Sequence, residues 1–269
     1  MSDGLDLPDL AGDVAIVTGG CGILGRGFAR ALAAAGAKVA VLDIDTGSAE
    51  QLARDIGASH AIGIGCDVAD EVSVTNAIER VASEWGRIDI LLNNAATKTG
   101  DLGAFFAPFE TYDLATWRAV MAVNIDGMFL MAKAAAPHLK ASGRARVIQT
   151  ASIYGLVGPD ARIYEGSDYL GGPINTPAVY SASKAAVIGL TRWLATHWAP
   201  DGIRVNCLVP GGVGSGQNET FENAYSARTP MDRMARPEEI TAAMLFLASR
   251  SSSYVTGQVL AADGGWTAW

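Results

Sequence analysis

The sequence predicts an α/β domain in which helices cover both faces of a parallel sheet. Two kinds of segment alternate along its 269 residues. Short apolar runs rich in β-branched residues occur at Val14–Val17, Lys38–Leu42, Ile88–Leu92, Arg146–Gln149 and Arg204–Val209. Longer stretches with helical periodicity occur at Glu50–Ile56, Val72–Trp85, Trp117–Leu139, Ala178–Trp198 and Pro237–Ala248. Because strands buried on both faces are typical of parallel sheets with right-handed crossovers, we expect a doubly wound sheet with its ligand at the carboxyl ends of the strands.

Length and composition limit the domain organisation. The chain is 49% hydrophobic and 18% charged, and its length suits one large domain or two small ones. No Pro/Gly/Ser-rich linker and no repeat divides it, so we expect one domain over residues 11–269 after a tail at residues 1–10.

The formal net charge is −8, which argues against nucleic acid as a partner because phosphate-binding surfaces are usually basic.

The cysteines and the apolar segments indicate a cytoplasmic protein. Cys21, Cys66 and Cys207 are odd in number and far apart, so neither a disulfide framework nor a metal site is expected. The first ten residues are acidic and show no export signal. No uninterrupted apolar run approaches the roughly 18 residues that suggest a membrane span. We therefore expect a soluble protein in a reducing compartment, with no membrane partner.

A glycine-rich turn follows the first apolar run, at Thr18–Gly25. Glycines let a backbone approach a pyrophosphate closely, and the N-terminus of the helix that follows attracts negative charge. An ordinary structural turn is the alternative reading, although the position directly after the first strand favours phosphate binding. The residues predicted to contact a dinucleotide here are Gly19, Cys21, Gly22, Ile23, Leu24 and Gly25.

The second apolar run ends at Asp43, where a carboxylate can bond both hydroxyls of an adenosine ribose. A 2′-phosphate would be repelled there, so NAD(H) is favoured over NADP(H), while a solvated turn aspartate remains the alternative. Two further polar sites follow the next two runs. Asp67 and Val68 are placed to meet the adenine, and Asn94 and Ala95 to let the backbone pass close to the cofactor, although ordinary turn chemistry would place the same residues there.

Tyr180 and Lys184 lie four residues apart at the start of a predicted helix, so both can face one site. A tyrosine with a pKa of about 10 is a poor base near neutrality. A neighbouring ammonium and the positive nicotinamide ring favour the phenolate, which can then exchange a proton with an alcohol or a carbonyl. Lys184 is also placed to bond the nicotinamide ribose.

Ser152 and Asn124 complete the candidate catalytic set. Ser152 ends the strand before this helix, where its hydroxyl can orient the reacting oxygen and stabilise its charge. A structural serine is the commoner role at a strand end. Asn124 lies among apolar residues of a helical stretch, where it either bonds the backbone locally or kinks the helix to hold a water. The second possibility would extend a proton relay from Tyr180 through Lys184.

Taken together, these motifs resemble the short-chain dehydrogenase/reductase family over residues 10–269. The tail adds Ser253–Gln258 and Asp263–Gly265 to the resemblance. It implies a single Rossmann-type domain with a mostly seven-stranded parallel sheet and a catalytic set of Asn124, Ser152, Tyr180 and Lys184. It also implies a homotetramer and cofactor contacts from Tyr180, Lys184, Pro210, Gly211, Val213 and Ser215.

The sequence departs from the family pattern in four places. Ile23 stands where a second glycine is common, Ala96 replaces the usual glycine after Asn94, and Ser215 replaces a threonine. The largest departure is an insertion at about residues 158–177, which we expect to line the substrate cleft, with a solvent-facing or subunit-contact loop as an equal alternative. The candidate substrate contacts are Lys98, Tyr154, Arg162, Tyr164 and Glu165.

The leading functional hypothesis is an NAD-dependent dehydrogenase of a secondary alcohol or ketone, with a sugar, polyol or related hydroxy acid as substrate. The polar insertion, Asp43 and the tail at Gly264–Trp269 motivate it. A reductase of 3-oxoacyl thioesters is the second enzyme hypothesis, and its acidic carrier would dock poorly on an acidic chain. The third hypothesis is a dinucleotide-binding regulator without turnover, against which the complete catalytic set argues.

Overall fold

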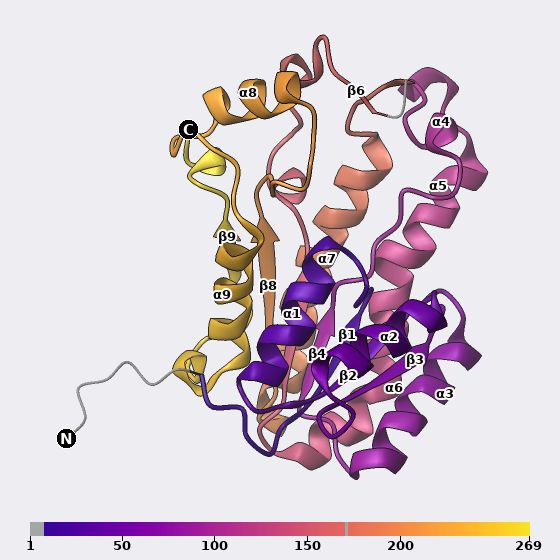
Figure 1. The fold of residues 1–269 in the computed structure, drawn as a ribbon, viewed down its shortest axis with the longest axis vertical. Helices are drawn as coiled ribbons and strands as arrows, with labels where there is room; N and C mark the ends of the chain where they lie inside the picture. The colour runs from indigo at the N-terminus through magenta and orange to yellow at the C-terminus, as the bar shows by residue number, and fades with distance from the viewer. Residues whose placement is uncertain (1–7, 170–171) are drawn as a thin grey trace, which may run out of the picture.

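The computed structural model describes residues 8–169 and 172–269, and its main feature is one parallel sheet (Figure 1). Its seven strands run in the order β3-β2-β1-β4-β5-β8-β9, which confirms the predicted doubly wound, Rossmann-type fold. Every pair of neighbouring strands is parallel. The strands are β1 (Val14–Thr18), β2 (Lys38–Asp43), β3 (Ala61–Gly65), β4 (Ile90–Asn93), β5 (Arg146–Thr150), β8 (Arg204–Pro210) and β9 (Val259–Ala262).

Helices cover both faces of this sheet. Helices α3, α6 and α7 share one hydrophobic core with the sheet, and α1, α2 and α9 share the core on the opposite face. Along β1 the side chains alternate between the two cores: Val14 and Ile16 belong to the first, and Ala15 and Val17 to the second. The helices on the sheet are α1 (Ile23–Ala34), α2 (Thr46–Ile56), α3 (Glu71–Trp85), α6 (Gly127–Ser142), α7 (Ala178–Trp198) and α9 (Pro237–Ala248).

The predicted helix Trp117–Leu139 is in fact two helices with a wider turn between them. Helix α5 (Leu114–Met121) leads into a π-helical turn at Ala122–Asp126, and α6 follows it. Asn124 sits in that turn and is fully buried. The predicted disturbance of the helix is therefore present, since π-helical turns inside α-helices are local insertions into the hydrogen-bond ladder.

The stretch Leu114–Ser142 is long and apolar enough to span a membrane, with a mean hydropathy of 1.4 over its most apolar window. In this structure it comprises α5, the π-helical turn and α6, and one side of it packs into the protein. Met131, Ala132, Ala135 and Leu139 from α6 are buried against the sheet, and α5 packs on α7 through Val120. Core helices of soluble proteins and membrane spans pass the same test of length and composition, so the result does not indicate a membrane.

Three small elements lie at the upper end of the molecule in Figure 1. They are α4 (Leu102–Phe105), α8 (Glu219–Arg228) and an antiparallel hairpin made of β6 (Asp168–Tyr169) and β7 (Gly172–Pro173). The hairpin belongs to the insertion at about 158–177, of which residues 170–171 lie outside the described part. At the other end of the chain, residues 1–7 of the expected tail also lie outside it. Leu10, assigned to that tail, is instead fully buried in the core.

The strand order places the candidate site. It reverses between β1 and β4, which are neighbours in the sheet although β2 and β3 lie between them in sequence. The helices that follow β1 and β4 therefore leave on opposite faces, and a crevice opens between their first turns. Because all strands are parallel, the segments after β1, β2, β4, β5 and β8 meet at this crevice.

Candidate active site

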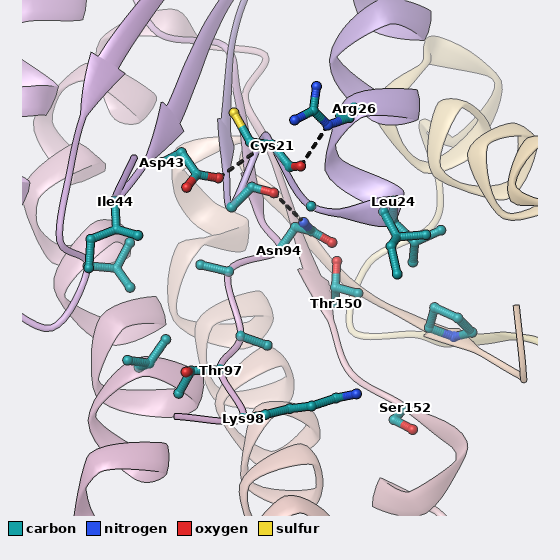
Figure 2. A pocket seen from close by; sticks show the side chains of 18 of the residues that line it. Cys21, Leu24, Arg26, Asp43, Ile44, Asn94, Thr97, Lys98, Thr150 and Ser152 are labelled. Carbon is teal, nitrogen blue, oxygen red and sulfur yellow. Dashed lines mark hydrogen bonds between the residues drawn. The ribbon is translucent and has the colours of Figure 1, made fainter. Parts of the chain in front are cut away.

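The carboxyl ends of the strands line a cavity of about 820 Å³, part of which is drawn in Figure 2. We refer to it as the cofactor cavity. Gly25 is the one predicted cofactor contact that does not line it. The predicted contacts that do line it are Gly19, Cys21, Gly22, Ile23, Leu24, Asp43, Asp67, Val68, Asn94, Ala95, Tyr180, Lys184, Pro210, Gly211, Val213 and Ser215.

The glycine turn fits a phosphate group. Gly22 is the N-cap of α1, no side chain caps the helix, and its first turn contains no acidic residue. The first N–H groups of a helix have no partner inside it, so they attract an anion. A Cβ built on Gly22 would meet one other atom, the Gly19 oxygen at 3.3 Å, which leaves the backbone open to the cavity.

Gly25 acts through packing instead of contact with the cavity. It is buried on α1, and a Cβ there would overlap the carbonyl oxygen of Gly19 and lie 2.9 Å from the Cα of Gly20. The absent side chain therefore lets the helix pack directly on the turn.

Asp43 lines the end of the cofactor cavity where the sequence predicts the adenosine. Its carboxylate accepts hydrogen bonds from the backbone N–H of Cys21 at 2.9 Å and of Asp45 at 3.2 Å. Figure 2 shows Asp43 next to the glycine turn, with Arg26 on the far side of Cys21. The Nε of Arg26 donates to the Cys21 carbonyl oxygen at 2.8 Å, and Arg26 also lines the cavity. Charges of both signs therefore border this end.

Asn94 ties the loop after β4 to the glycine turn. Its Nδ2 donates to the carbonyl oxygens of Thr18 at 3.3 Å and Gly19 at 3.2 Å. The hydroxyl of Thr18 accepts hydrogen bonds from the N–H groups of Asn94 and Ala95 at 3.0 and 3.1 Å. These contacts hold two walls of the cavity together, so Asn94 has a structural role in addition to its position at the cavity.

Tyr180, Ser152 and Lys184 meet in the cofactor cavity, as their positions in the sequence predict. Tyr180 and Lys184 lie on the first two turns of α7, and Ser152 follows β5. The Lys184 Nζ lies 5.8 Å from the centre of the Tyr180 ring and donates to the carbonyl oxygen of Thr150 at 3.0 Å. Lys184 is 3% exposed and Ser152 8% exposed, so both side chains are surrounded by protein atoms instead of water.

The pKa of Tyr180 differs from expectation. Burial raises it, and a hydrogen bond with Ser152 acts in the opposite direction. Burial also lowers the pKa of Lys184 to about 8. In the protein alone, burial therefore dominates the pKa values of both groups, because it disfavours their charged forms, and the expected lowering of the Tyr180 pKa by Lys184 is not found.

Asn124 does not line the cofactor cavity. Its Oδ1 accepts a hydrogen bond from the Thr97 N–H at 3.0 Å, and its Nδ2 donates to the Ser183 hydroxyl at 3.2 Å. The side chain therefore joins the π-helical turn to α7 and to the loop that carries Lys98. A role for Asn124 in proton relay stays a prediction.

A second cavity of about 340 Å³ adjoins the first, and we refer to it as the front cavity. The two share lining residues Ile23, Lys98, Tyr180, Ser215 and Gln217. The insertion contributes Tyr164, Asp168 and Ile174–Pro177, α4 and the residue after it contribute Phe105 and Phe106, and α8 contributes Phe221. Because Tyr180 borders both cavities, the front cavity is the candidate substrate site.

The structure divides the predicted substrate contacts into two groups. Lys98 and Tyr164 line the front cavity. Tyr154 lines neither cavity, although its hydroxyl accepts a hydrogen bond from that of Tyr164 at 3.2 Å. Arg162 and Glu165 line neither cavity. The side chain of Arg162 is 79% exposed and paired with Asp160 at 2.6 Å, and Glu165 is exposed at the end of a short 3₁₀ turn. We therefore remove Arg162 and Glu165 from the candidate substrate site.

Several lining residues were not predicted. Arg26, Thr150 and Gln217 line the cofactor cavity, and Phe105 and Phe221 line the front cavity. Arg26 lies one residue after the predicted glycine turn, so its proximity was a usable signal. The two phenylalanines come from short helices far apart in sequence, and no local pattern indicates that they meet.

Among the described residues, no group of three or more His, Cys, Asp or Glu side chains is placed to hold a metal ion.

Comparison with known proteins identifies the family. A family model described as enoyl-(acyl carrier protein) reductase matches residues 21–267. A cis-4-hydroxycyclohexanecarboxylate dehydrogenase from Sinomonas cyclohexanicum is 37% identical over 95% of this chain and 96% of its own. A galactitol 2-dehydrogenase (L-tagatose-forming) from Cereibacter sphaeroides is 38% identical over 97% of both chains. The chain belongs to the short-chain dehydrogenase/reductase family, whose members bind a nicotinamide dinucleotide.

A solved structure supports the same family assignment. A gluconate 5-dehydrogenase from Burkholderia cenocepacia, crystallised with NADP and tartrate, superimposes with a TM-score of 0.85 at 33% identity, covering 97% of both chains. The similarity to alcohol and polyol dehydrogenases supports an oxidoreductase that acts on CH–OH groups.

Proposed function

We propose that this protein is an NAD(H)-dependent dehydrogenase that moves a hydride between nicotinamide and a secondary alcohol or ketone, its substrate a sugar, a polyol or a related hydroxy acid. The observation that carries the proposal is the meeting of Tyr180, Ser152 and Lys184 in the cofactor cavity, at a point where Tyr180 also borders the front cavity. The names of the relatives support the substrate class: galactitol is a polyol, and gluconate and hydroxycyclohexanecarboxylate are hydroxy acids.

The proposed preference for NAD(H) rests on Asp43. Its carboxylate lines the cofactor cavity, where it would bond the ribose hydroxyls and repel a 2′-phosphate. Two observations oppose this preference: Arg26 borders the same end of the cavity, and the Burkholderia structure holds NADP. Because Asp43 is the last residue of β2 and Arg26 is already bonded to Cys21, we give Asp43 the greater weight.

In the proposed mechanism the nicotinamide, when bound, accepts or supplies the hydride. Tyr180 holds or receives the proton of the substrate oxygen, and the Ser152 hydroxyl orients that oxygen by hydrogen bonding. The cation of Lys184 favours loss of the Tyr180 proton once alcohol is in place. Asn124 holds Thr97 and Ser183 in place through its hydrogen bonds. We propose that it also extends the proton path beyond Lys184.

The second candidate function is reduction of 3-oxoacyl thioesters. The description of the matching family model favours it, since that description names a reductase of acyl carrier protein substrates. The front cavity, of about 340 Å³, and the net charge of −8 favour small alcohols over an acyl chain held by an acidic carrier.

An activity panel tests the proposed function. Purified protein is assayed for reduction of NAD⁺ and of NADP⁺ with polyols, sugar acids and cyclic hydroxy acids, and for NADH oxidation with an acetoacetyl thioester. We expect turnover of at least one CH–OH substrate, with NAD⁺ preferred over NADP⁺. Activity confined to the thioester would replace the proposal with the second candidate, and NADH binding without turnover of any substrate would indicate a regulator.

We also propose that the protein is a cytoplasmic homotetramer, as is usual in the family. Large apolar side chains on α6 and α7 support this assembly, since Phe129 is 51% exposed and Trp193 60% exposed on the outer faces of these helices. Exposed aromatic side chains are common where copies of a chain associate.

A further inference from the structure

The walls of the front cavity are largely aromatic. Phe105 and Phe106 pack edge to face with their ring centres 5.0 Å apart, and Tyr164 stacks on Phe221 at 5.6 Å. Ile174 adds an aliphatic side chain. These walls come from three separate segments, namely α4, the insertion and α8. Such a surface binds a hydrocarbon body well, because apolar area on both sides leaves water.

The amide side chains in the cavity already bond other parts of the protein. The Nδ2 of Asn175 donates to the Phe106 carbonyl oxygen at 2.7 Å. The Nε2 of Gln217 donates to the Val213 carbonyl oxygen at 2.9 Å, and its Oε1 accepts from the Ser215 N–H at 2.8 Å. These amides therefore fix the shape of the cavity, and a ligand that used them would have to displace existing hydrogen bonds.

Two of the hydroxyl groups that line the cavity, those of Tyr164 and Thr176, are engaged in the same way. The Tyr164 hydroxyl lies 2.5 Å from that of Thr176 and 3.2 Å from that of Tyr154. A substrate with a hydroxyl on every carbon would bury several of them against ring faces and engaged groups, and each hydroxyl left without a partner weakens binding. The cavity therefore favours a substrate with few hydroxyl groups beyond the one that reacts.

Among the described residues that line the front cavity, the charged ones are Lys98 and Asp168. Asp168 is exposed. Lys98 borders both cavities, as Tyr180 does, and Figure 2 shows its side chain extended from the loop after β4 toward the side of the pocket that holds Ser152. The surrounding protein lowers the pKa of the Lys98 ammonium by desolvation, and an anionic ligand group would offset that effect.

We propose that the front cavity selects a hydroxy acid or oxo acid with a compact hydrocarbon body, whose carboxylate binds Lys98 while its hydroxyl-bearing carbon lies at Tyr180. The inference rests on the proposed function and narrows its substrate class from sugars and polyols to acids. The carboxylate forms and breaks no covalent bond. Oxidation takes a hydride from the carbon and a proton from the hydroxyl, and reduction returns both.

A pair of substrates matched in shape and different in charge tests the inference. The probe is 4-hydroxycyclohexanecarboxylate, and its comparison is 4-hydroxycyclohexanecarboxamide, which has nearly the same shape and no charge. We expect kcat/KM of the wild-type protein to favour the acid at least about tenfold. In Lys98→Met the ratio of acid to amide falls toward one, mainly through a higher KM for the acid, and in Lys98→Arg a preference for the acid remains.

Lys133→Met is the matched control. Lys133 lies on α6, its side chain is 59% exposed, and it pairs with Glu71, so its replacement should leave the acid-to-amide ratio at the wild-type value. NADH binding and circular dichroism verify that each variant is folded. A wild-type ratio near one, or a ratio that Lys98→Met leaves unchanged, overturns the inference.

The two proposals can fail separately. If polyols are oxidised while the acid has no advantage over the amide, the selectivity proposed for Lys98 is wrong and the dehydrogenase assignment stands. If NADH binds and no alcohol of any class is oxidised, both are wrong.

Discussion

At the scale of single residues, Asp43 combines a structural contact with a proposed contact to the cofactor. Its carboxylate holds the N–H of Cys21, so removing the whole side chain would disturb the glycine turn as well as cofactor choice. Replacement by asparagine retains an acceptor for that N–H and removes the charge. Asp43→Asn therefore isolates the electrostatic effect.

We predict that Asp43→Asn lowers the preference for NAD⁺ over NADP⁺ at least about tenfold, because a charge-assisted hydrogen bond is worth about 1.5–3 kcal/mol and repulsion of a 2′-phosphate is lost as well. The measurement is the ratio of kcat/KM for the two cofactors. Asp55→Asn, an exposed change on α2, is the control. An unchanged ratio in Asp43→Asn would remove the basis for NAD(H).

Lys184 is the residue whose burial has the clearest consequence for stability. Its pKa is about 8 in the folded protein against 10.5 in the reference state. Between these values the unfolded chain binds the proton and the folded protein does not, so stability rises with pH. Below pH 8 both states are protonated and the buried charge is destabilising by about 3 kcal/mol.

We predict that the free energy of unfolding of the wild-type protein increases relative to Lys184→Met by up to about 3 kcal/mol as the pH rises from 8 to 10.5. Methionine cannot donate to the Thr150 carbonyl oxygen, which adds a pH-independent difference between the two proteins. Urea unfolding of the cofactor-free proteins at several pH values measures the change. Two curves that stay parallel over this range would show that Lys184 is not desolvated.

At the scale of elements, α1 is held against the glycine turn by the absence of a side chain at Gly25. Gly189 offers a matched comparison, since it lies within α7 and a Cβ there meets nothing within 4 Å. The same Gly→Ala change thus meets a tight backbone contact in one helix and open space in the other.

We predict that Gly25→Ala destabilises the fold by about 1–3 kcal/mol and weakens NADH binding, because α1 must move away from the turn. Gly189→Ala should stabilise by up to about 1 kcal/mol, since alanine loses less conformational entropy in a helix. Thermal unfolding and NADH titration measure both effects. Equal NADH affinity in the two variants would show that the packing of α1 on the turn does not shape the site.

The strands and the longest helices could be predicted from sequence because their burial is periodic. Helices α7 and α9 begin and end where predicted, and β1 and β5 extend one residue further than predicted. Helix α8 was missed because Tyr225 is its single fully buried residue, so its apolar pattern is weak. Short helices that pack through one or two side chains leave little periodicity to detect.

Most residues that line the cofactor cavity were predictable for a related reason, since they end or follow buried strands and parallel strands end at one edge of the sheet. Most residues that line the front cavity were not. In the insertion, Arg162 turns to Asp160 while Tyr164, two residues later, faces the front cavity. A short 3₁₀ turn has no long pattern from which to infer its inward face, and its cavity-side partners, such as Phe221, lie far away in sequence.

At the scale of the whole molecule, the sheet and its helices form a rigid base and the smaller elements enclose the front cavity. The insertion is tied to α8 by the pair of Ser167 and Asn218, whose side chains are 2.8 to 2.9 Å apart. The Nδ2 of Asn175 ties it to the loop after α4. The front cavity is therefore enclosed by segments that are far apart from one another in sequence, namely α4, the insertion and α8.

We predict that light scattering finds a particle of four times the 27.9 kDa chain mass. Trp193→Glu on α7 should lower that mass, because a charge would replace a ring that is 60% exposed in one chain and is expected to be covered in the assembly. Val72→Ser on α3, also exposed, is the control. A monomer at micromolar concentration would contradict the proposed tetramer.

The central claim is that the Tyr180 hydroxyl exchanges the proton of the substrate oxygen. Its most direct test is Tyr180→Phe, in which NADH affinity and kcat are measured on the same preparation with the best alcohol from the panel. We predict NADH affinity close to wild type and a fall in kcat of about 10²- to 10⁴-fold, the usual contribution of a general acid or base. Turnover within a few-fold of wild type would contradict the mechanism.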